Sequence, residues 1–197
     1  MNLNIKTKSK ITLGKETIMR TFIALDLSKE VKRELEINHQ VIKNNCSRYR
    51  ITNTGNLHIT LKFLGEISSD KLVQIKHIMD DLGSSNSIFG LCLSKWGSFK
   101  SKRGKIIWVG LDGDLIKLND LAKQCHNNLS AIVNDKKDFN FKPHITIVRD
   151  AIINKELKEW HKLKKVQFKV KHLNLYESVF NNRKVSYVSR YKVDLAK

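Results

Sequence analysis

The chain has 197 residues, 41% of them hydrophobic, and carries a formal net charge of +18. This length fits one domain and this composition supplies a core, which argues against wholesale disorder; no stretch approaches the roughly 18 consecutive apolar residues of a helical membrane span. The charge favours polyanionic partners, because Lys and Arg release counterions from phosphates, although a solvated lysine-rich surface explains most of it equally well.

The N-terminal residues are polar and lysine-rich and lack the apolar segment of a secretory signal. A strand-like run starts just after Met19, and Gly14 to Glu16 can be encoded by a purine-rich ribosome-binding sequence. We hypothesise that the natural chain starts at Met19, so that residues 1–18 are a non-native extension and residues 19–197 form a single bilobal domain. N-terminal mass determination of the protein from its own host tests this, since a mature chain that begins at Met1 would contradict it. The three cysteines are scattered and form no Cys-x-x-Cys pair, so we expect a reducing compartment and a cytoplasmic monomer.

Periodic hydrophobic patterns and turn residues predict strands alternating with helices. Helices are expected over 29–44 (with Ser28 as N-cap), 69–83, 114–133 and 155–163. Strands are expected over 21–27, 57–64, 88–95, 105–111, 143–148, 166–175 and 185–193. Basic loops are expected over 48–56 and 97–104. The last two strands are predicted to form a hairpin that turns near residues 181–182.

Two of the expected strands share the motif His-Ile-Thr, which begins at His58 in one and at His144 in the other. Alternate side chains of a strand point the same way. His58 and Thr60 therefore share one face, as do His144 and Thr146, while the aliphatic residues beside them face a core. Two such strands brought together would surround one cleft with two imidazoles and two hydroxyls.

The order of helix, motif strand, helix and two strands occurs twice along the chain. An internal duplication of this kind predicts an α+β fold of two pseudo-symmetric lobes, each an antiparallel sheet with helices outside. The sequence has no glycine-rich phosphate loop, which argues against nucleotide-driven chemistry, and we expect no cofactor.

Paired histidines suit the cleavage of a phosphodiester. One imidazole can take a proton from the attacking oxygen and the other can give a proton to the leaving oxygen, since an unperturbed pKa of about 6.5 allows both near neutral pH. Threonine hydroxyls can hydrogen-bond phosphate oxygens, and a nearby guanidinium can stabilise the developing negative charge. The candidate site is His58, Thr60, His144, Thr146 and Arg149.

Less specific interpretations compete with this one. A single histidine on a strand is more often structural, and two histidines can ligate zinc, but neither motif has a second ligand at suitable spacing, so we expect no metal. Phe22 and Phe63 can stack on a nucleobase, yet core packing is the better interpretation, as it is for the tryptophans. Four other histidines are expected at exposed or capping positions of helices: His39, His77, His126 and His161.

These motifs resemble the two-histidine phosphoesterase superfamily and, within it, the RNA 2′,3′-cyclic phosphodiesterases, also called 2′-5′ RNA ligases. The matching segments are Met19 to Leu27, Leu57 to Gly65, Lys105 to Leu111, Phe141 to Arg149 and Leu175 to Ser178. The resemblance covers essentially all of residues 19–195, and the first 18 residues depart from it.

The resemblance implies an active-site groove between the lobes, no metal, and hydrolysis of the 2′,3′-cyclic phosphate of an RNA end to a 2′-phosphate. His144 would be the general base acting on water, and His58 the general acid to the departing 3′-oxygen. Thr60, Thr146 and Arg149 would hold the phosphate. The family can also join RNA ends through a 2′-5′ linkage, which is the reverse direction of the same chemistry.

Two other functions stay open at this point. One is a two-histidine phosphodiesterase acting on a small cyclic nucleotide or an ADP-ribose cyclic phosphate; the other is a non-catalytic module that binds RNA or a nucleotide. Two complete motifs favour an enzyme, and the charge weakly favours RNA over a small substrate. We expect the basic loops Arg48–Arg50 and Lys100–Lys105 beside the first motif, in the same lobe, contacting RNA phosphates.

Overall fold

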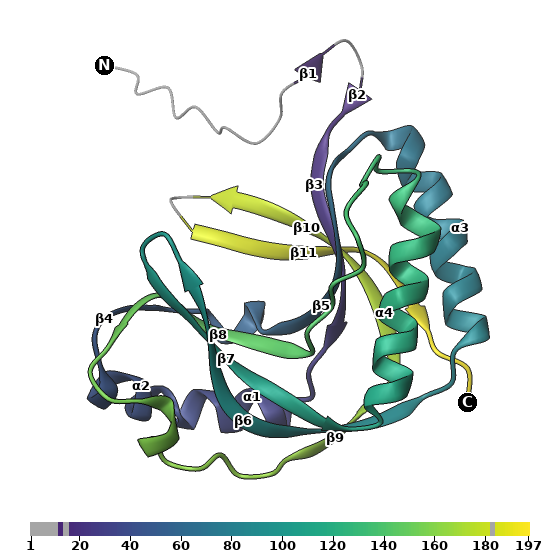
Figure 1. The fold of residues 1–197 in the computed structure, drawn as a ribbon. Helices are drawn as coiled ribbons and strands as arrows, with labels where there is room; N and C mark the ends of the chain where they lie inside the picture. The colour runs from purple at the N-terminus through teal and green to yellow at the C-terminus, as the bar shows by residue number, and fades with distance from the viewer. Residues whose placement is uncertain (1–11, 14–15, 182–183) are drawn as a thin grey trace, which may run out of the picture.

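Two large antiparallel sheets make up most of the described part of the chain, and each contributes one His-Ile-Thr strand (Figure 1). The computed structural model describes residues 12–13, 16–181 and 184–197. The four-stranded sheet has the order β11-β10-β3-β5. Its strands are β3 (Met19–Asp26), β5 (His58–Ile67), β10 (His172–Asn181) and β11 (Lys184–Asp194). The five-stranded sheet has the order β4-β8-β7-β6-β9. Its strands are β4 (Cys46–Ile51), β6 (Phe89–Ser101), β7 (Gly104–Gly113), β8 (His144–Ile153) and β9 (Gln167–Val170).

Helices cover the outer side of each sheet. The long helices α3 (Ser69–Ser85) and α4 (Leu115–Ser130) lie side by side against the four-stranded sheet (Figure 1). The short helices α1 (Lys29–Ile37) and α2 (His39–Asn45) lie by the five-stranded sheet. Two 3₁₀ turns complete the list, η1 (Thr54–Asn56) and η2 (Leu157–Glu159). This arrangement confirms the predicted α+β fold of two lobes with helices outside.

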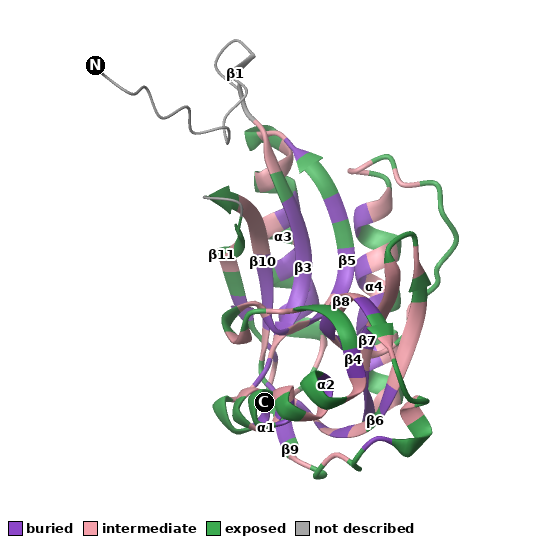
Figure 2. Ribbon diagram, turned by 90° about the vertical axis from the view of Figure 1, so that its left-hand side faces the viewer, coloured by how far each residue is buried: buried purple, intermediate pink, exposed green. Residues whose placement is uncertain are grey.

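One continuous apolar core runs through both lobes. It follows from the period of each element, since alternate strand residues and one stripe of each helix are apolar. In α4 the inward stripe includes Leu118, Leu121 and Leu129, all fully buried. The central strand β3 is buried from Thr21 to Leu25, as the purple band in Figure 2 shows, because it has a neighbouring strand on each side and helices behind it. The core therefore holds the two motif strands in a fixed relation.

The two lobes are interleaved along the chain. Strands β3 and β5 pair with each other, but the rest of their sheet is β10 and β11, which come last in the sequence. The other sheet is built by β4, which lies between β3 and β5 in sequence, and by β6 to β9, which lie between β5 and β10. The helices α3 and α4 come from the same stretch of sequence but pack on the four-stranded sheet. Each lobe thus takes elements from both halves of the chain.

Several predicted boundaries were wrong. The helix expected over 29–44 is two helices, because the buried Asn38 ends α1 and donates its side-chain amide to the Glu34 carbonyl. The predicted cap Ser28 is confirmed, since its hydroxyl accepts from the Val31 amide. The helix expected over 155–163 is only the short turn η2.

The remaining corrections concern strands. The basic loop expected over 48–56 begins within strand β4, which pairs with β8. The loop expected over 97–104 is mostly strand, because β6 and β7 pair as far as Ser101 and Gly104. The strand expected over 166–175 is two strands, β9 and β10, which belong to different sheets. The predicted turn near residues 181–182 falls partly outside the described residues, although the hairpin of β10 and β11 is confirmed.

Most of the predicted N-terminal extension also lies outside the described residues. Within it, β1 (Thr12–Leu13) and β2 (Glu16–Thr17) pair only with each other. In the part of the chain that the structure describes, no helix is long and apolar enough to cross a membrane.

Gly97 gives a first prediction. A Cβ at this position would lie 2.1 Å from the ring of Trp108, its partner on β7. Gly97→Ala should therefore displace the indole and lower the free energy of unfolding by about 1–3 kcal/mol, as overpacking does. Gly90→Ala on the same strand is the matched control, because its Cβ would meet only an Asp114 oxygen at 3.8 Å. Equal urea midpoints for the two variants would contradict the packing argument.

Candidate functional site

A groove between the two sheets brings together all five residues that the sequence singled out. Its volume is about 350 Å³. His58 and Thr60 reach it from β5. His144, Thr146 and Arg149 reach it from β8. Two imidazoles, two hydroxyls and a guanidinium therefore border one space.

A β-bulge explains how Arg149 reaches the groove. Strict alternation would put it on the opposite face from Thr146, three residues earlier. Opposite this segment, β7 advances one residue, from Trp108 to Ile107, while β8 advances two, from Thr146 to Val148. The extra residue shifts the alternation by one. Arg149 thereby returns to the face that carries the motif.

Strand β5 has a bulge at the matching place. There β3 advances from Ala24 to Ile23 while β5 advances from Thr60 to Lys62. Phe63 consequently lies on the groove face, in the position that corresponds to Arg149 on the other motif strand. Its side chain is 69% exposed, so its expected place in the core was wrong.

The two histidines are oriented in the same way. The Nδ1 atom of His58 lies 2.7 Å from the Asn56 carbonyl, and that of His144 lies 2.6 Å from the Lys142 carbonyl. A carbonyl only accepts, so each Nδ1 carries the hydrogen in the neutral ring. Each Nε2 is then left with its lone pair, and that of His58 lies 2.8 Å from the Thr60 hydroxyl.

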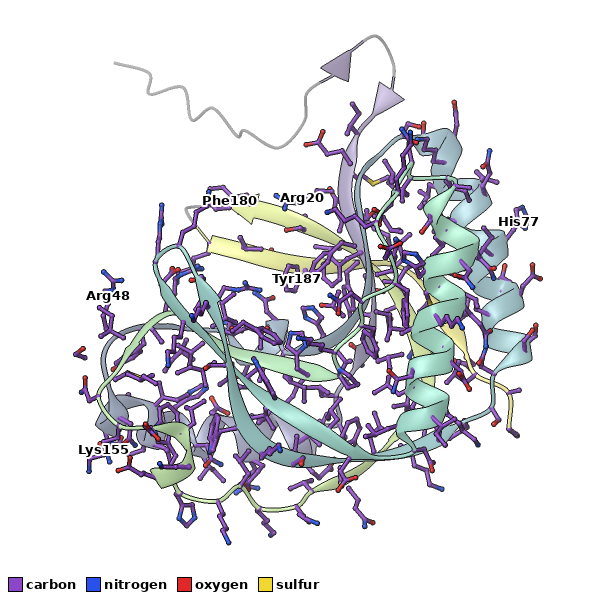
Figure 3. The ribbon with its side chains drawn as sticks, viewed as in Figure 1. Arg20, Arg48, His77, Lys155, Phe180 and Tyr187 are labelled. Carbon is purple, nitrogen blue, oxygen red and sulfur yellow. The ribbon has the colours of Figure 1, made fainter. Side chains whose placement is uncertain are left out.

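Aromatic side chains enclose His58. Phe22 lies with its ring centroid 4.9 Å from the imidazole, and Tyr187 of β11 meets it edge-on at 5.1 Å. Figure 3 shows Tyr187 between the two sheets. Tyr176 is farther away and donates its hydroxyl to Asp26, which also accepts from Asn174. Phe22 is buried, as its predicted core role requires.

The second histidine has a similar but more open surrounding. Phe99 of β6 meets the His144 ring edge-on at 5.1 Å, and Trp108 lies at 6.1 Å. The Lys142 ammonium lies 5.8 Å from the centre of the Phe99 ring. Phe99 and Tyr187 could not be assigned to the site from the sequence, because both come from strands far from the motifs. The role of Asn56 could have been recognised from the sequence. It lies two residues before His58, just as Lys142 lies two residues before His144.

Burial and positive neighbours lower the pKa of both imidazoles. For His58 burial is the largest cause; Arg149 and His144 act in the same direction, the Asn56 carbonyl and Asp26 oppose them, and the pKa falls to about 4. Burial also lowers the pKa of His144, with Arg149 adding to the effect. Both rings are consequently neutral near pH 7 when the groove is empty.

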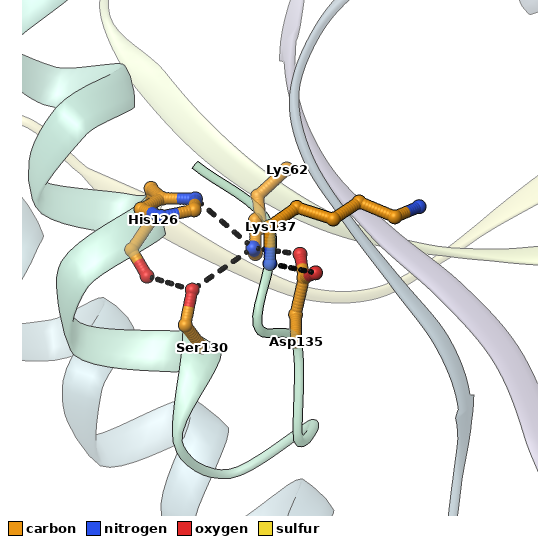
Figure 4. Close-up of polar contacts among 5 residues, drawn as sticks. All are labelled: Lys62, His126, Ser130, Asp135 and Lys137. Carbon is orange, nitrogen blue, oxygen red and sulfur yellow. Dashed lines mark hydrogen bonds and ion pairs between the residues drawn. The ribbon is translucent and has the colours of Figure 1, made fainter. Parts of the chain in front are cut away.

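Behind the groove, the bulge in β5 turns Lys62 toward α4 (Figure 4). The Lys62 side chain is only 6% exposed, and its ammonium contacts Ser130 at 3.0 Å, His126 at 3.2 Å and the Asp135 carboxylate at 2.5 Å. A buried charge must be paired, and the ion pair lowers the pKa of Asp135. His126 was expected at an exposed or capping position and instead belongs to this set, which we call the Lys62 cluster. It ties the first motif strand to the segment that leads into the second.

The basic loops lie in a different place from the one predicted. Both belong to the five-stranded sheet, and so to the lobe of the second motif. Lys100, Lys102 and Arg103 lie at the tip of the β6–β7 hairpin, which we call the basic hairpin. The Arg48 side chain donates to the Arg103 carbonyl at 2.5 Å, at the outer edge of the sheet (Figure 3). Arg50 pairs with Asp150 at 3.1 Å.

Residues of metal-binding type do not gather in this site. Within the described ranges, no three or more His, Cys, Asp and Glu side chains lie close enough together to hold one ion. The groove offers only two histidines, on strands of different sheets.

Comparison with known proteins agrees with the geometry. Residues 30–180 match the 2′-5′ RNA ligase superfamily. The chain is 30% identical to an RNA 2′,3′-cyclic phosphodiesterase of Methanocaldococcus jannaschii over 81% of its length and 91% of that protein. It is 33% identical to one of Thermotoga maritima over 66% and 70% of the two chains. The crystal structure of Escherichia coli LigT complexed with 3′-AMP superposes with a TM-score of 0.80 at 24% identity, covering 91% of this chain and 99% of that one, which shows the shared fold.

The fold and the paired His-x-Thr strands define a two-histidine phosphoesterase. Within that class, the chain belongs to the 2′-5′ RNA ligase superfamily. The family resemblance seen in the sequence is thereby confirmed.

The lowered pKa of His58 predicts a loss of stability in acid. The unfolded chain, with a histidine pKa near 6.5, takes up a proton before the folded protein does, so stability falls as the pH drops from about 6.5 toward 4. His58→Gln cannot titrate and should lose less free energy of unfolding over this range. Urea unfolding at pH 7 and pH 4.5 measures the difference. Equal losses in the parent and in His58→Gln would contradict this prediction.

Proposed function

We propose that this protein hydrolyses the 2′,3′-cyclic phosphate at an RNA end to a 2′-phosphate, by acid–base catalysis between His58 and His144. The observation that carries the proposal is that both imidazoles border one groove with two threonines and an arginine. Each presents Nε2 and ties Nδ1 to a carbonyl. The family contains enzymes named RNA 2′,3′-cyclic phosphodiesterase, and this chain is an enzyme of that class.

In the proposed reaction His144 is the base. Its Nε2 takes a proton from water, and the water oxygen attacks phosphorus. The bond from phosphorus to the 3′-oxygen breaks, and His58 gives a proton to that oxygen. The product carries a 2′-phosphate and a free 3′-hydroxyl. Each proton transfer of this kind is typically worth on the order of 10²–10⁴ in rate.

The acid role requires a proton on His58, whose pKa in the empty groove is about 4. A phosphodiester anion bound beside the imidazole favours the charged form and raises this pKa. Substrate binding thus supplies the charge that keeps the acid protonated.

The other three candidate site residues hold the phosphate in this proposal. Thr60 and Thr146 donate hydroxyl hydrogens to its non-bridging oxygens, and Arg149 donates to the oxygen on which negative charge builds. If an RNA 5′-hydroxyl replaces water, the same proton transfers join two ends through a 2′-5′ linkage. The proposed chemistry uses no metal.

We further propose that residues 19–197 act as one bilobal unit, a monomer in the cytoplasm. The core shared by the two lobes supports a single unit. In the described part of the chain, all three cysteines are free, as in a reducing compartment.

Replacing either histidine should abolish turnover while leaving the fold intact. We expect His58→Ala and His144→Ala each to lower kcat by at least about 10²-fold. The assay is hydrolysis of a mononucleoside 2′,3′-cyclic phosphate in EDTA, with the product terminus identified and thermal unfolding as the control. Parental turnover by either variant would refute the acid–base mechanism. If the parent enzyme loses its turnover in EDTA and regains it only when zinc or manganese is added, the reaction depends on a metal.

A sulfur-substituted substrate separates the two roles. When sulfur replaces the bridging 3′-oxygen, the leaving thiolate needs no proton. His58→Ala should then regain most of its lost rate, whereas His144→Ala should not. The opposite pattern would exchange the assigned roles.

Arg149 and the basic hairpin should affect different kinetic constants. Arg149→Ala should lower kcat on every substrate, because its contact strengthens in the transition state.

Changing Lys100, Lys102 and Arg103 together to Gln should raise KM for oligonucleotides and reduce the salt dependence of affinity, by about 0.7 log units per log unit of salt for each lost phosphate contact. A mononucleoside substrate should be almost unaffected. A parental salt slope in the triple variant would exclude the hairpin as an RNA contact.

A further inference from the structure

A second cavity of about 500 Å³ adjoins the groove. It lies between strand β5 and the segment that connects α4 to β8, and we call it the Phe139 pocket. Phe63, Asn140 and Phe141 line both cavities, so the two spaces meet at these side chains. A ligand that fills the groove therefore ends next to the pocket.

The walls of the Phe139 pocket are aromatic and open to solvent. Phe63 is 69% exposed and Phe139 is 37% exposed. Phe139 lies nearly parallel to Phe141, with ring centroids 6.4 Å apart, and tilted against His126 at 5.6 Å. Exposed rings of this kind are the platforms on which unpaired bases stack in single-stranded nucleic acid complexes.

The polar groups of the pocket suit a nucleoside better than a bare phosphate. Lys137 is exposed, and Figure 4 shows its side chain directed away from the Lys62 cluster. The Asp138 carboxylate also lines the cavity and would repel a cluster of phosphates. Lys62 and Asp135 also line the pocket but pair with each other, which leaves Lys137 and Asp138 to meet a ligand. One such cation, one such carboxylate and several rings match a single base and ribose with one adjoining phosphodiester.

The pocket is also held in place. The ion pair of Lys62 with Asp135 fixes the start of the connecting segment, and the Asp135 carboxylate accepts from the Lys137 amide at 3.2 Å. A wall that is already ordered needs little reorganisation on binding, which favours affinity.

We propose that the Phe139 pocket binds a second nucleoside of RNA, unpaired, beside the nucleotide whose phosphate reacts. The inference rests on the function proposed above and adds a preference for oligonucleotides over mononucleotides. Two sources share this chemistry: the nucleotide that precedes the cyclic end in the same strand, and the first nucleoside of another RNA that offers its 5′-hydroxyl. In both, a base stacks between the rings of Phe63 and Phe139.

The test compares three substrates with cyclic ends: a mononucleoside, a dinucleotide, and the same dinucleotide with its first base removed. The parent should prefer the full dinucleotide by at least about fivefold in kcat/KM, the lower end of the gain from stacking one base. The abasic dinucleotide should lose this preference. Phe139→Ala should lose it too while hydrolysing the mononucleoside at the parental rate, and Phe139→Trp should keep it.

Phe180→Ala is the matched control, because Phe180 is an exposed phenylalanine of β10 outside both cavities. It should leave all three values unchanged. A parental preference in Phe139→Ala, an equal loss on the mononucleoside and dinucleotide, or an abasic dinucleotide as good as the complete one would each exclude the preceding nucleotide as the occupant. The inference is overturned if, in addition, an added free dinucleotide acts independently of Phe139.

Two further measurements complete the design. The first adds a dinucleotide with a free 5′-hydroxyl to the mononucleoside substrate. Inhibition or joining that depends on Phe139 assigns the pocket to a second strand. If neither effect depends on Phe139, a Phe139-dependent preference for the cyclic dinucleotide assigns the pocket to the preceding nucleotide. If the parent hydrolyses neither substrate, the proposed function has failed. Calorimetric binding of a dinucleotide ending in a 2′-phosphate then still decides the pocket, and equal affinity of parent and Phe139→Ala would overturn it.

Discussion

The hydrogen bond from each imidazole Nδ1 to the carbonyl two residues earlier is the contact on which the proposed chemistry depends. It fixes the tautomer and leaves Nε2 to exchange protons with a substrate. The bond is local, so the backbone just before each motif strand orients the imidazole of that strand. The turn η1 supplies this entry before His58, and Pro143, which restricts the backbone of Lys142, supplies it before His144. The rest of the fold has to bring the two rings to one groove.

The sequence was sufficient to predict four of the groove residues on a common face, because alternation along a strand is local. It was not sufficient for Arg149, which strict alternation puts on the other face. Its place depends on a bulge, and a bulge depends on the register with a partner strand that the sequence does not reveal. The burial of Lys62 has a similar origin, since its carboxylate partner comes from a segment beyond the next helix but one. Both features belong to pairings between distant parts of the chain.

The same distinction explains the errors in the elements. The long helices α3 and α4 have continuous apolar stripes and were predicted well, whereas β4 is an edge strand with an exposed middle and lacks the alternating pattern of a strand. The stretch expected as one strand over 166–175 looks uniform in sequence, yet Lys171 separates two strands that join different sheets. For the basic hairpin, order along the chain suggested the wrong lobe. Local signals identified elements, and only the tertiary structure could allocate them to sheets.

The interleaving of the lobes has a consequence for how the protein is made. The sheet that carries the first motif lacks two of its four strands until β10 and β11 have left the ribosome, and these strands come last. Pairings between segments so far apart in sequence close large loops and are slow to form. Until then β3 exposes an unpaired edge, which is a hazard for aggregation in a partly made chain. Tyr187, which packs on His58, lies on β11, so the aromatic surroundings of the first histidine are completed only after β11 has been made.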